Sequence, residues 1–188
     1  MKLKPHFDYQ LNELLQKRWS PRAFADKMLT NEQVLTLFEA ARWAASCNNE
    51  QPWRFVWSLK DGSDKYNKLF ECLKPGNQEW VASAPLVILT VIHKVFTASG
   101  KPNDWAAHDL GLAIGNLTTQ ATSMDIFVHS MAGFDKDKAI ELFSLPEDYE
   151  PMTMIAVGYL GDPAMLSEFN QKREAELQSR KPLTELFL

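Results

Sequence analysis

Two arginines and a serine lie within five residues near the N-terminus, in the order Arg18, Trp19, Ser20, Pro21, Arg22. A guanidinium group offers planar paired donors and a hydroxyl adds one more, so this cluster suits a phosphate dianion. Taken alone, two arginines at the exit of a helix are more often a solvated surface pair. The phosphate interpretation therefore needs a second signal.

A second polar segment, residues 45–55, includes Ser46, Cys47, Asn49 and Gln51. Amide side chains donate and accept hydrogen bonds together, which is what the edge of a flavin's pyrimidine ring requires. An Asn-rich segment before a strand can also be only a turn. The residue types alone leave both interpretations open.

The other reactive side chains form no recognisable site. His93, His108 and His129 are too far apart in the sequence to indicate a metal triad, so we predict no metal. Cys47 has no nearby base to make it a nucleophile, which favours a small packed residue beside the ligand. The tryptophans are most simply core or interface residues, although one could stack a substrate ring: Trp43, Trp57, Trp80 and Trp105. No GxGxxG or GxxxxGK[ST] motif indicates a nicotinamide-binding Rossmann unit or a P-loop.

Composition indicates a folded, cytoplasmic protein. The 188 residues fit one domain, 1–188, and 45% are hydrophobic. A net charge of −4 with scattered Lys and Arg argues against a nucleic-acid partner. Two cysteines do not make a disulfide framework, which suits a reducing compartment. The first residues lack the apolar core of a signal peptide, and the longest apolar run, residues 85–92, is too short to cross a membrane.

The elements that would position these residues alternate between helices and strands. Apolar periodicity predicts helices over 9–17, 64–72 and 167–178, and one that begins near Asp135. A capping box at Thr30 and Gln33 predicts another helix, which runs toward Ala45. Strands are expected over 53–59, 85–92, 125–131 and 151–160, with 85–92 buried on both faces. We predict an α+β fold with a mixed central sheet flanked by helices.

One predicted helix and the C-terminal tail indicate a partner. Apolar residues surround most of the helix over 104–124, which predicts burial on nearly all sides. Gly111 and Gly115 would let another helix approach closely, within the chain or from a second subunit. The tail, 179–188, is apolar enough that we expect it to pack at a dimer interface.

Taken together, the motifs resemble those of the nitroreductase family. Its members carry an N-terminal Arg-x-Ser-x-Arg/Lys element, then Pro/Ala-Ser-x-x-Asn-x-Gln-Pro-Trp-x-Phe, and later glycines after strands and a basic C-terminal element. The matching residues in this chain are Arg18, Ser20 and Arg22, then Asn49, Gln51, Pro52, Trp53 and Phe55, then Gly133, Gly158 and Arg180 to Leu183. The resemblance covers residues 9–187, and the two N-terminal motifs are its specific part.

The resemblance implies a dimer with FMN at its interface. Arg18, Ser20 and Arg180 would bind the phosphate, and Arg22 would reach the N1/O2 side of the ring. Trp19 would lie beside the flavin or its ribityl chain. Further roles are implied for Asn49 at the pyrimidine edge, Ser46 and Gln51 along the same wall, and backbone groups of Ala132 and Gly133 facing N5. Ala132 stands where many members have an acidic residue, and the segment between residues 92 and 104 is shorter than in many members, which implies a more open pocket.

The implied function is ping-pong reduction of nitroaromatics, quinones or similar electron-poor molecules by NADH or NADPH through FMN. Catalysis would belong to the flavin, with Arg22 stabilising the charge of the reduced ring. A flavin reductase acting on a small aldehyde or enone is the alternative among enzymes. A non-catalytic FMN-binding module is the alternative from another class.

Overall fold

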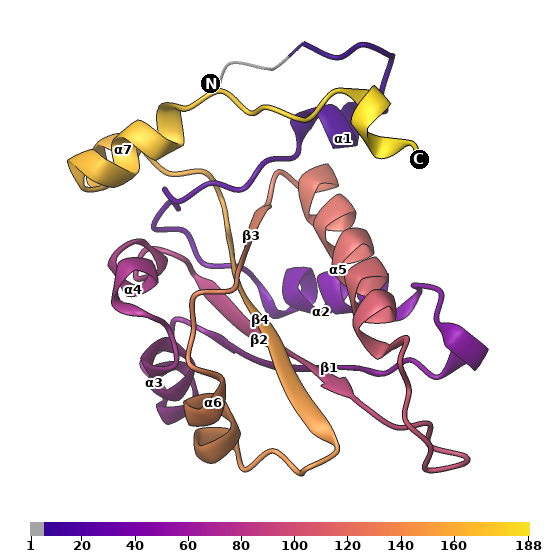
Figure 1. The fold of residues 1–188 in the computed structure, drawn as a ribbon. Coiled ribbons are helices and arrows are strands. Elements are labelled where there is room, and N and C mark those ends of the chain that lie inside the picture. The colour runs from indigo at the N-terminus through magenta and orange to yellow at the C-terminus, as the bar shows by residue number, and fades with distance from the viewer. Residues whose placement is uncertain (1–5) are drawn as a thin grey trace.

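The computed structural model describes residues 6–188 and has a four-stranded sheet between two layers of helices (Figure 1). Residues 1–5 of the predicted domain lie outside the described part. The strand order is β1-β2-β4-β3. The strands are β1 (Trp53–Leu59), β2 (Leu86–His93), β3 (Phe127–Met131) and β4 (Tyr149–Gly158). The α+β prediction is confirmed.

The prediction of a mixed sheet is wrong, because all three strand pairs are antiparallel. The connection from β1 to β2 contains α3 (Asp64–Glu71) and α4 (Pro75–Val81). An eight-residue helix is about 12 Å long, roughly half of the ~23 Å span of a seven-residue strand. Such short helices do not carry the chain back across the sheet, so β2 starts at Leu86 opposite Leu59, where β1 ends.

The sheet separates two apolar cores. Side chains of β2 alternate between them, since Val87, Leu89 and Val91 join one core while Leu86, Ile88 and Ile92 join the other. Helices α3, α4 and α6 (Lys136–Phe143) cover the first core, and α2 (Asn31–Arg42) and α5 (Ala106–Ser123) cover the second. The predicted burial of this strand on both faces is confirmed.

Local signals located most helices. The capping box at Thr30 is present, with Thr30 Oγ1 accepting from Gln33 N–H and Gln33 Oε1 accepting from Thr30 N–H. Helix α4 was not predicted, because its Gly76 and Asn77 have low helix propensity. Pro75 at its start was the available signal.

The helix predicted over 104–124 is α5, and the prediction that it is buried on nearly all sides is wrong for a single chain. Leu110, Ala113 and Leu117 of α5 are buried against the sheet. The opposite side exposes Gly111, Gly115, Leu112 and the preceding Trp105, the last two at 41% and 58%. An apolar surface of this kind on a helix is typical of a face that another protein surface covers.

Both ends of the described chain meet beside β3. Figure 1 shows α1 (Glu13–Lys17) next to the C-terminal segment that follows α7 (Glu168–Ala175). Arg18 Nη2 donates to Gln178 Oε1 at 3.5 Å, which joins the two segments. The tail itself is uncovered, and Leu186 and Phe187 are 63% and 72% exposed.

Candidate functional site

The arginine cluster carries uncompensated positive charge. Arg18 Nη1 donates to Ser20 Oγ at 3.4 Å, and Arg180 is close enough to act on Arg18 electrostatically. Burial lowers the pKa of Arg18, and the positive charge of Arg180 lowers it further. Within residues 6–188, Arg18 and Arg180 form no ion pair with a carboxylate. This is the electrostatic condition in which a bound dianion is favourable.

From this cluster the chain runs along β3, one of the two edge strands of the sheet. Trp19 meets Phe127, the first residue of β3, edge to face with ring centroids 6.3 Å apart. Two residues further, the Pro21 carbonyl accepts from His129 Nδ1 at 2.8 Å. Arg22 is therefore held beside the middle of β3, and its side chain is partly exposed.

Ala132 and Gly133 follow directly after β3, on the same edge as Arg22. The Gly133 carbonyl accepts from Lys74 N–H at 3.0 Å and from Asn77 Nδ2 at 2.9 Å. A Cβ on Gly133 would lie 2.5 Å from Asn77 Nδ2, so any larger residue there would displace the Asn77 amide from its present position. The two bonds fix the orientation of the peptide group at the end of the strand.

The amide segment is a strained loop. Asn48, Asn49 and Gln51 all have positive φ, between 52° and 56°, a conformation that is unfavourable for residues other than glycine and is least so for Asn. Ser46 Oγ accepts from Gln51 N–H at 3.0 Å and closes the loop. The Asn49 side chain remains exposed.

Asp109, which the motif analysis missed, holds this loop to α5. Its carboxylate is 2% exposed and accepts from Cys47 N–H at 2.9 Å, and it is also 3.1 Å from His108 Nδ1. The available signal was an acid on the apolar side of an amphipathic pattern, next to Leu110 and Ala113.

A single chain does not bring the two motifs together. Asp109 lies in the first turn of α5 and contacts the loop, whereas Lys17 pairs with Asp125 just beyond the other end of that helix. The 18 residues of α5 correspond to roughly 27 Å. The length of α5 therefore separates Arg18 from Asn49. Ser20, Arg22, Ala132, Gly133 and Arg180 lie with Arg18 along β3, whereas Ser46, Asn49 and Gln51 lie at the far end of α5.

Comparison with known proteins then decides the family. The model of the nitroreductase family matches residues 15–75 and 58–159, which include both N-terminal motifs. The chain belongs to the nitroreductase family. Arg180 lies beyond the matched residues.

Solved structures of other proteins agree with this family. One, described as an oxidoreductase containing FMN, has 32% identity and a TM-score of 0.91, and the match covers 97% of this chain and 93% of that one. A structure from Desulfovibrio desulfuricans, solved in complex with FMN, has 25% identity, a TM-score of 0.72 and coverage of 95% and 97%. A relative from Archaeoglobus fulgidus, whose name proposes an NADH dehydrogenase/NAD(P)H nitroreductase, is 25% identical over 80% of this chain and 85% of its own length.

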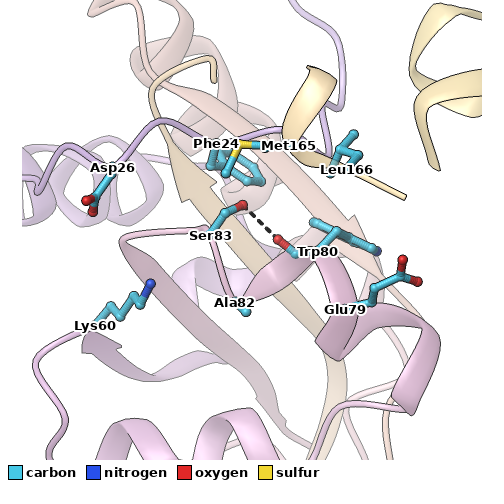
Figure 2. A pocket seen from close by; sticks show the side chains of 9 residues that line it. All are labelled: Phe24, Asp26, Lys60, Glu79, Trp80, Ala82, Ser83, Met165 and Leu166. Carbon is cyan, nitrogen blue, oxygen red and sulfur yellow. Dashed lines mark hydrogen bonds between the residues drawn. The ribbon is translucent and has the colours of Figure 1, made fainter. Parts of the chain in front are cut away.

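This nitroreductase-family chain also has a cleft that contains none of the predicted site residues (Figure 2). It measures about 400 Å³. Asp26, Lys60 and Met165 are among the residues around it, and Ser83 Oγ donates to the Trp80 carbonyl at 2.8 Å in its wall. Phe24 and Trp80 are 0% and 3% exposed, so their rings do not present a stacking surface to a ligand there.

Two features are absent from residues 6–188. No cluster of His, Cys, Asp or Glu suitable for a metal ion occurs among them. No helix in the same part of the chain has the length and apolarity needed to span a membrane.

Proposed function

We propose that the protein is an FMN-dependent NAD(P)H oxidoreductase. The observation that carries this proposal is the positive pair of Arg18 and Arg180 beside Ser20, which both ends of the described chain build at the start of β3 and which, within residues 6–188, forms no ion pair with a carboxylate. Guanidinium groups without acidic partners suit a phosphate dianion. FMN in two solved relatives supports the same cofactor here.

The arrangement along β3 supports an orientation for the flavin. With its phosphate at Arg18, the ring would extend along the strand toward Gly133, passing Arg22. Arg22 would hydrogen-bond the N1/O2 side, and backbone groups of Ala132 and Gly133 would face N5. Gly133 has no side chain of its own between its backbone and the ring, and hydrogen bonds from Asn77 and Lys74 engage its carbonyl.

We propose that the working unit is a homodimer in which each flavin site is composite. The distance between the ends of α5 supports this proposal, because Asn49 of one chain is too far from that chain's own arginines to contact the same flavin. A second copy would supply Ser46, Asn49 and Gln51. The exposed α5 face and the uncovered tail, residues 179–188, are the surfaces that would pack against it.

The proposed reaction is ping-pong. NADH or NADPH is oxidised and leaves, and an electron-poor acceptor such as a nitroaromatic or a quinone is then reduced. FMN, when bound, supplies the two-electron chemistry between these partners. Arg22 would stabilise the negative charge that reduction leaves on the ring, and a hydrogen bond between charged groups contributes roughly 1.5–3 kcal/mol. Ala132 is exposed and would bring no carboxylate to the acceptor, which would suit varied acceptors.

Purification and anaerobic reduction test the proposal. The purified protein should be yellow and release a cofactor with the mass of FMN, and NADH or NADPH should bleach its visible flavin absorption. Absence of FMN would contradict the cofactor. Retention of FMN without bleaching by either nucleotide would instead favour the non-catalytic module. A panel of acceptors separates nitroaromatic or quinone reduction from the alternative of aldehyde or enone reduction.

The proposed compartment is the cytoplasm. The free thiols of Cys47 and Cys72 support this proposal, because a reducing compartment keeps cysteines unpaired. Fractionation of cells expressing the protein tests this location.

A further inference from the structure

A buried carboxylate of the C-terminal helix engages the segment that carries Arg22. Glu174 lies in the last turn of α7 and is 4% exposed. Its two oxygens accept from Arg22 N–H at 2.9 and 3.1 Å, and one of them also accepts from Ala23 N–H at 3.3 Å. Burial of a carboxylate is unfavourable unless hydrogen bonds or an opposite charge compensate. Here main-chain donors provide that compensation.

His129 engages the same segment from the side of the sheet. A carbonyl oxygen can only accept, so His129 carries a proton on Nδ1 and donates it to Pro21 O at 2.8 Å. The imidazole also packs against the Trp80 ring, 4.5 Å between centroids. The Ala23 carbonyl in turn accepts from Gly161 N–H at 2.9 Å. The main chain on both sides of Arg22 is thereby held by α7 and by the sheet.

The hydrogen bonds that Glu174 and His129 form with the main chain leave the guanidinium group of Arg22 available. Glu174 binds the backbone of Arg22 and, within residues 6–188, forms no ion pair with its guanidinium. The negative charge of Glu174 nonetheless acts on that guanidinium through space. A carboxylate placed in this way orients an arginine without occupying its donors.

We propose that Glu174 is a positioning residue for the flavin site: it holds the Arg22 backbone so that the guanidinium is directed to the flavin ring. Glu174 also anchors the helix that leads to Gln178 and Arg180, both of which lie beside Arg18. One carboxylate thus joins the ring-binding and phosphate-binding parts of the site. This inference rests on the proposed function.

A double-mutant cycle between Glu174 and Arg22 tests the proposal. Glu174→Gln retains one acceptor oxygen but places an NH2 group opposite a backbone N–H. We expect it to lower the flavin midpoint potential, as Arg22→Ala does. It should also weaken FMN binding about tenfold through the helix that leads to Arg180, an effect equal to the loss of one charge-assisted hydrogen bond. In an Arg22→Ala background the same change should leave the potential unchanged, because residues that act through each other are not additive. The loss of binding through the helix that leads to Arg180 should persist in that background.

The matched control is Glu168→Gln, which removes the same charge from an exposed position on the same helix. It should change neither FMN binding nor the potential. If the Glu174→Gln protein does not fold, Glu174→Asp takes its place in the cycle. This change keeps the charge but shortens the side chain by one methylene group, and we expect the same effects.

The outcomes separate this inference from the proposed function. If the unaltered protein binds no FMN, the proposed function itself fails. If it binds FMN and the effects of the Glu174 and Arg22 changes on the midpoint potential are additive, Glu174 has only a structural role and this inference is overturned. Non-additive effects on the potential support it.

Discussion

At the scale of single residues, Arg18 and Arg22 are expected to differ in role although they lie four positions apart. Arg18 lies beside Ser20 and Arg180, whereas Arg22 lies beside the middle of β3. We predict that Arg18→Ala weakens FMN binding about 10- to 100-fold, the equivalent of one charge-assisted hydrogen bond of roughly 1.5–3 kcal/mol. Arg22→Ala should mainly lower the midpoint potential and turnover.

Titration of FMN into each apoprotein, with potentiometry of the bound flavin, measures these effects. Arg42→Ala removes the same charge from an exposed position on α2 and serves as the control. Equal effects of the Arg18 and Arg22 changes on both measurements would contradict the division of roles.

His129 gives the fold a defined pH dependence. Burial, more than any other cause, lowers the pKa of His129 from 6.5 to about 4. The unfolded chain therefore binds a proton between these values that the folded chain does not, so the stability falls as pH decreases from about 6.5 to about 4. At about 1.36 kcal/mol per pKa unit, the loss approaches roughly 3 kcal/mol at pH 4.

The measurement is denaturant unfolding of the original protein and of His129→Gln across this pH range. Gln does not titrate and retains an N–H donor for Pro21 O, so its stability should fall less between pH 6.5 and 4. His6→Gln, at a side chain that is 88% exposed, should behave like the original protein. Parallel pH profiles for the His129 variant and the original protein would show that His129 does not contribute.

At the scale of elements, α5 performs two tasks. Its buried side packs on the sheet, and its Asp109 holds the strained loop that carries Asn49. Its exposed side is the surface we assign to a second copy.

This assignment predicts that Leu112→Asp dissociates the dimer, because it buries an unpaired charge at an apolar interface. Light scattering should give the monomer mass, and FMN should be lost with the partner's loop. Ile140→Asp is the matched control, since Ile140 is 39% exposed, close to the 41% of Leu112, and lies on α6 on the opposite face of the sheet. A Leu112→Asp dimer that retains FMN would contradict the assigned interface.

At the scale of the whole molecule, the composite site predicts complementation between two inactive variants. Arg18→Ala disrupts the FMN site built on the arginines of its own chain. Asn49→Ala disrupts the other FMN site, which is built on the partner's arginines and to which its own chain contributes only the loop. In a mixed dimer one site therefore carries both changes and the other carries neither. Co-expression should restore FMN binding to about half of the sites of the purified heterodimer. No recovery in that heterodimer would show that both motifs serve the same site from one chain.

Local sequence signals were sufficient for most elements. Thr30 and Gln33 predicted the start of α2, and residues 53–59 coincide with β1, because caps and strand periodicity depend on near neighbours. The pattern of buried β-branched residues also located β2. Helix α4 was not predicted, because Gly76 and Asn77 weaken a helix that is stabilised mainly by the burial of Trp80 and Val81.

The sequence by itself determined the types of residue in both motifs, and hence the resemblance and the proposed ligand chemistry of Arg18 and Asn49. Only the tertiary structure decided how they are distributed in space, because long-range packing sets strand direction and the placement of helix ends. It made the sheet antiparallel, placed the two motifs at opposite ends of α5, and brought Glu174 to the Arg22 backbone across more than 150 positions of sequence. No local pattern around Glu174 encodes that contact, since its partners are main-chain N–H groups that every non-proline residue carries.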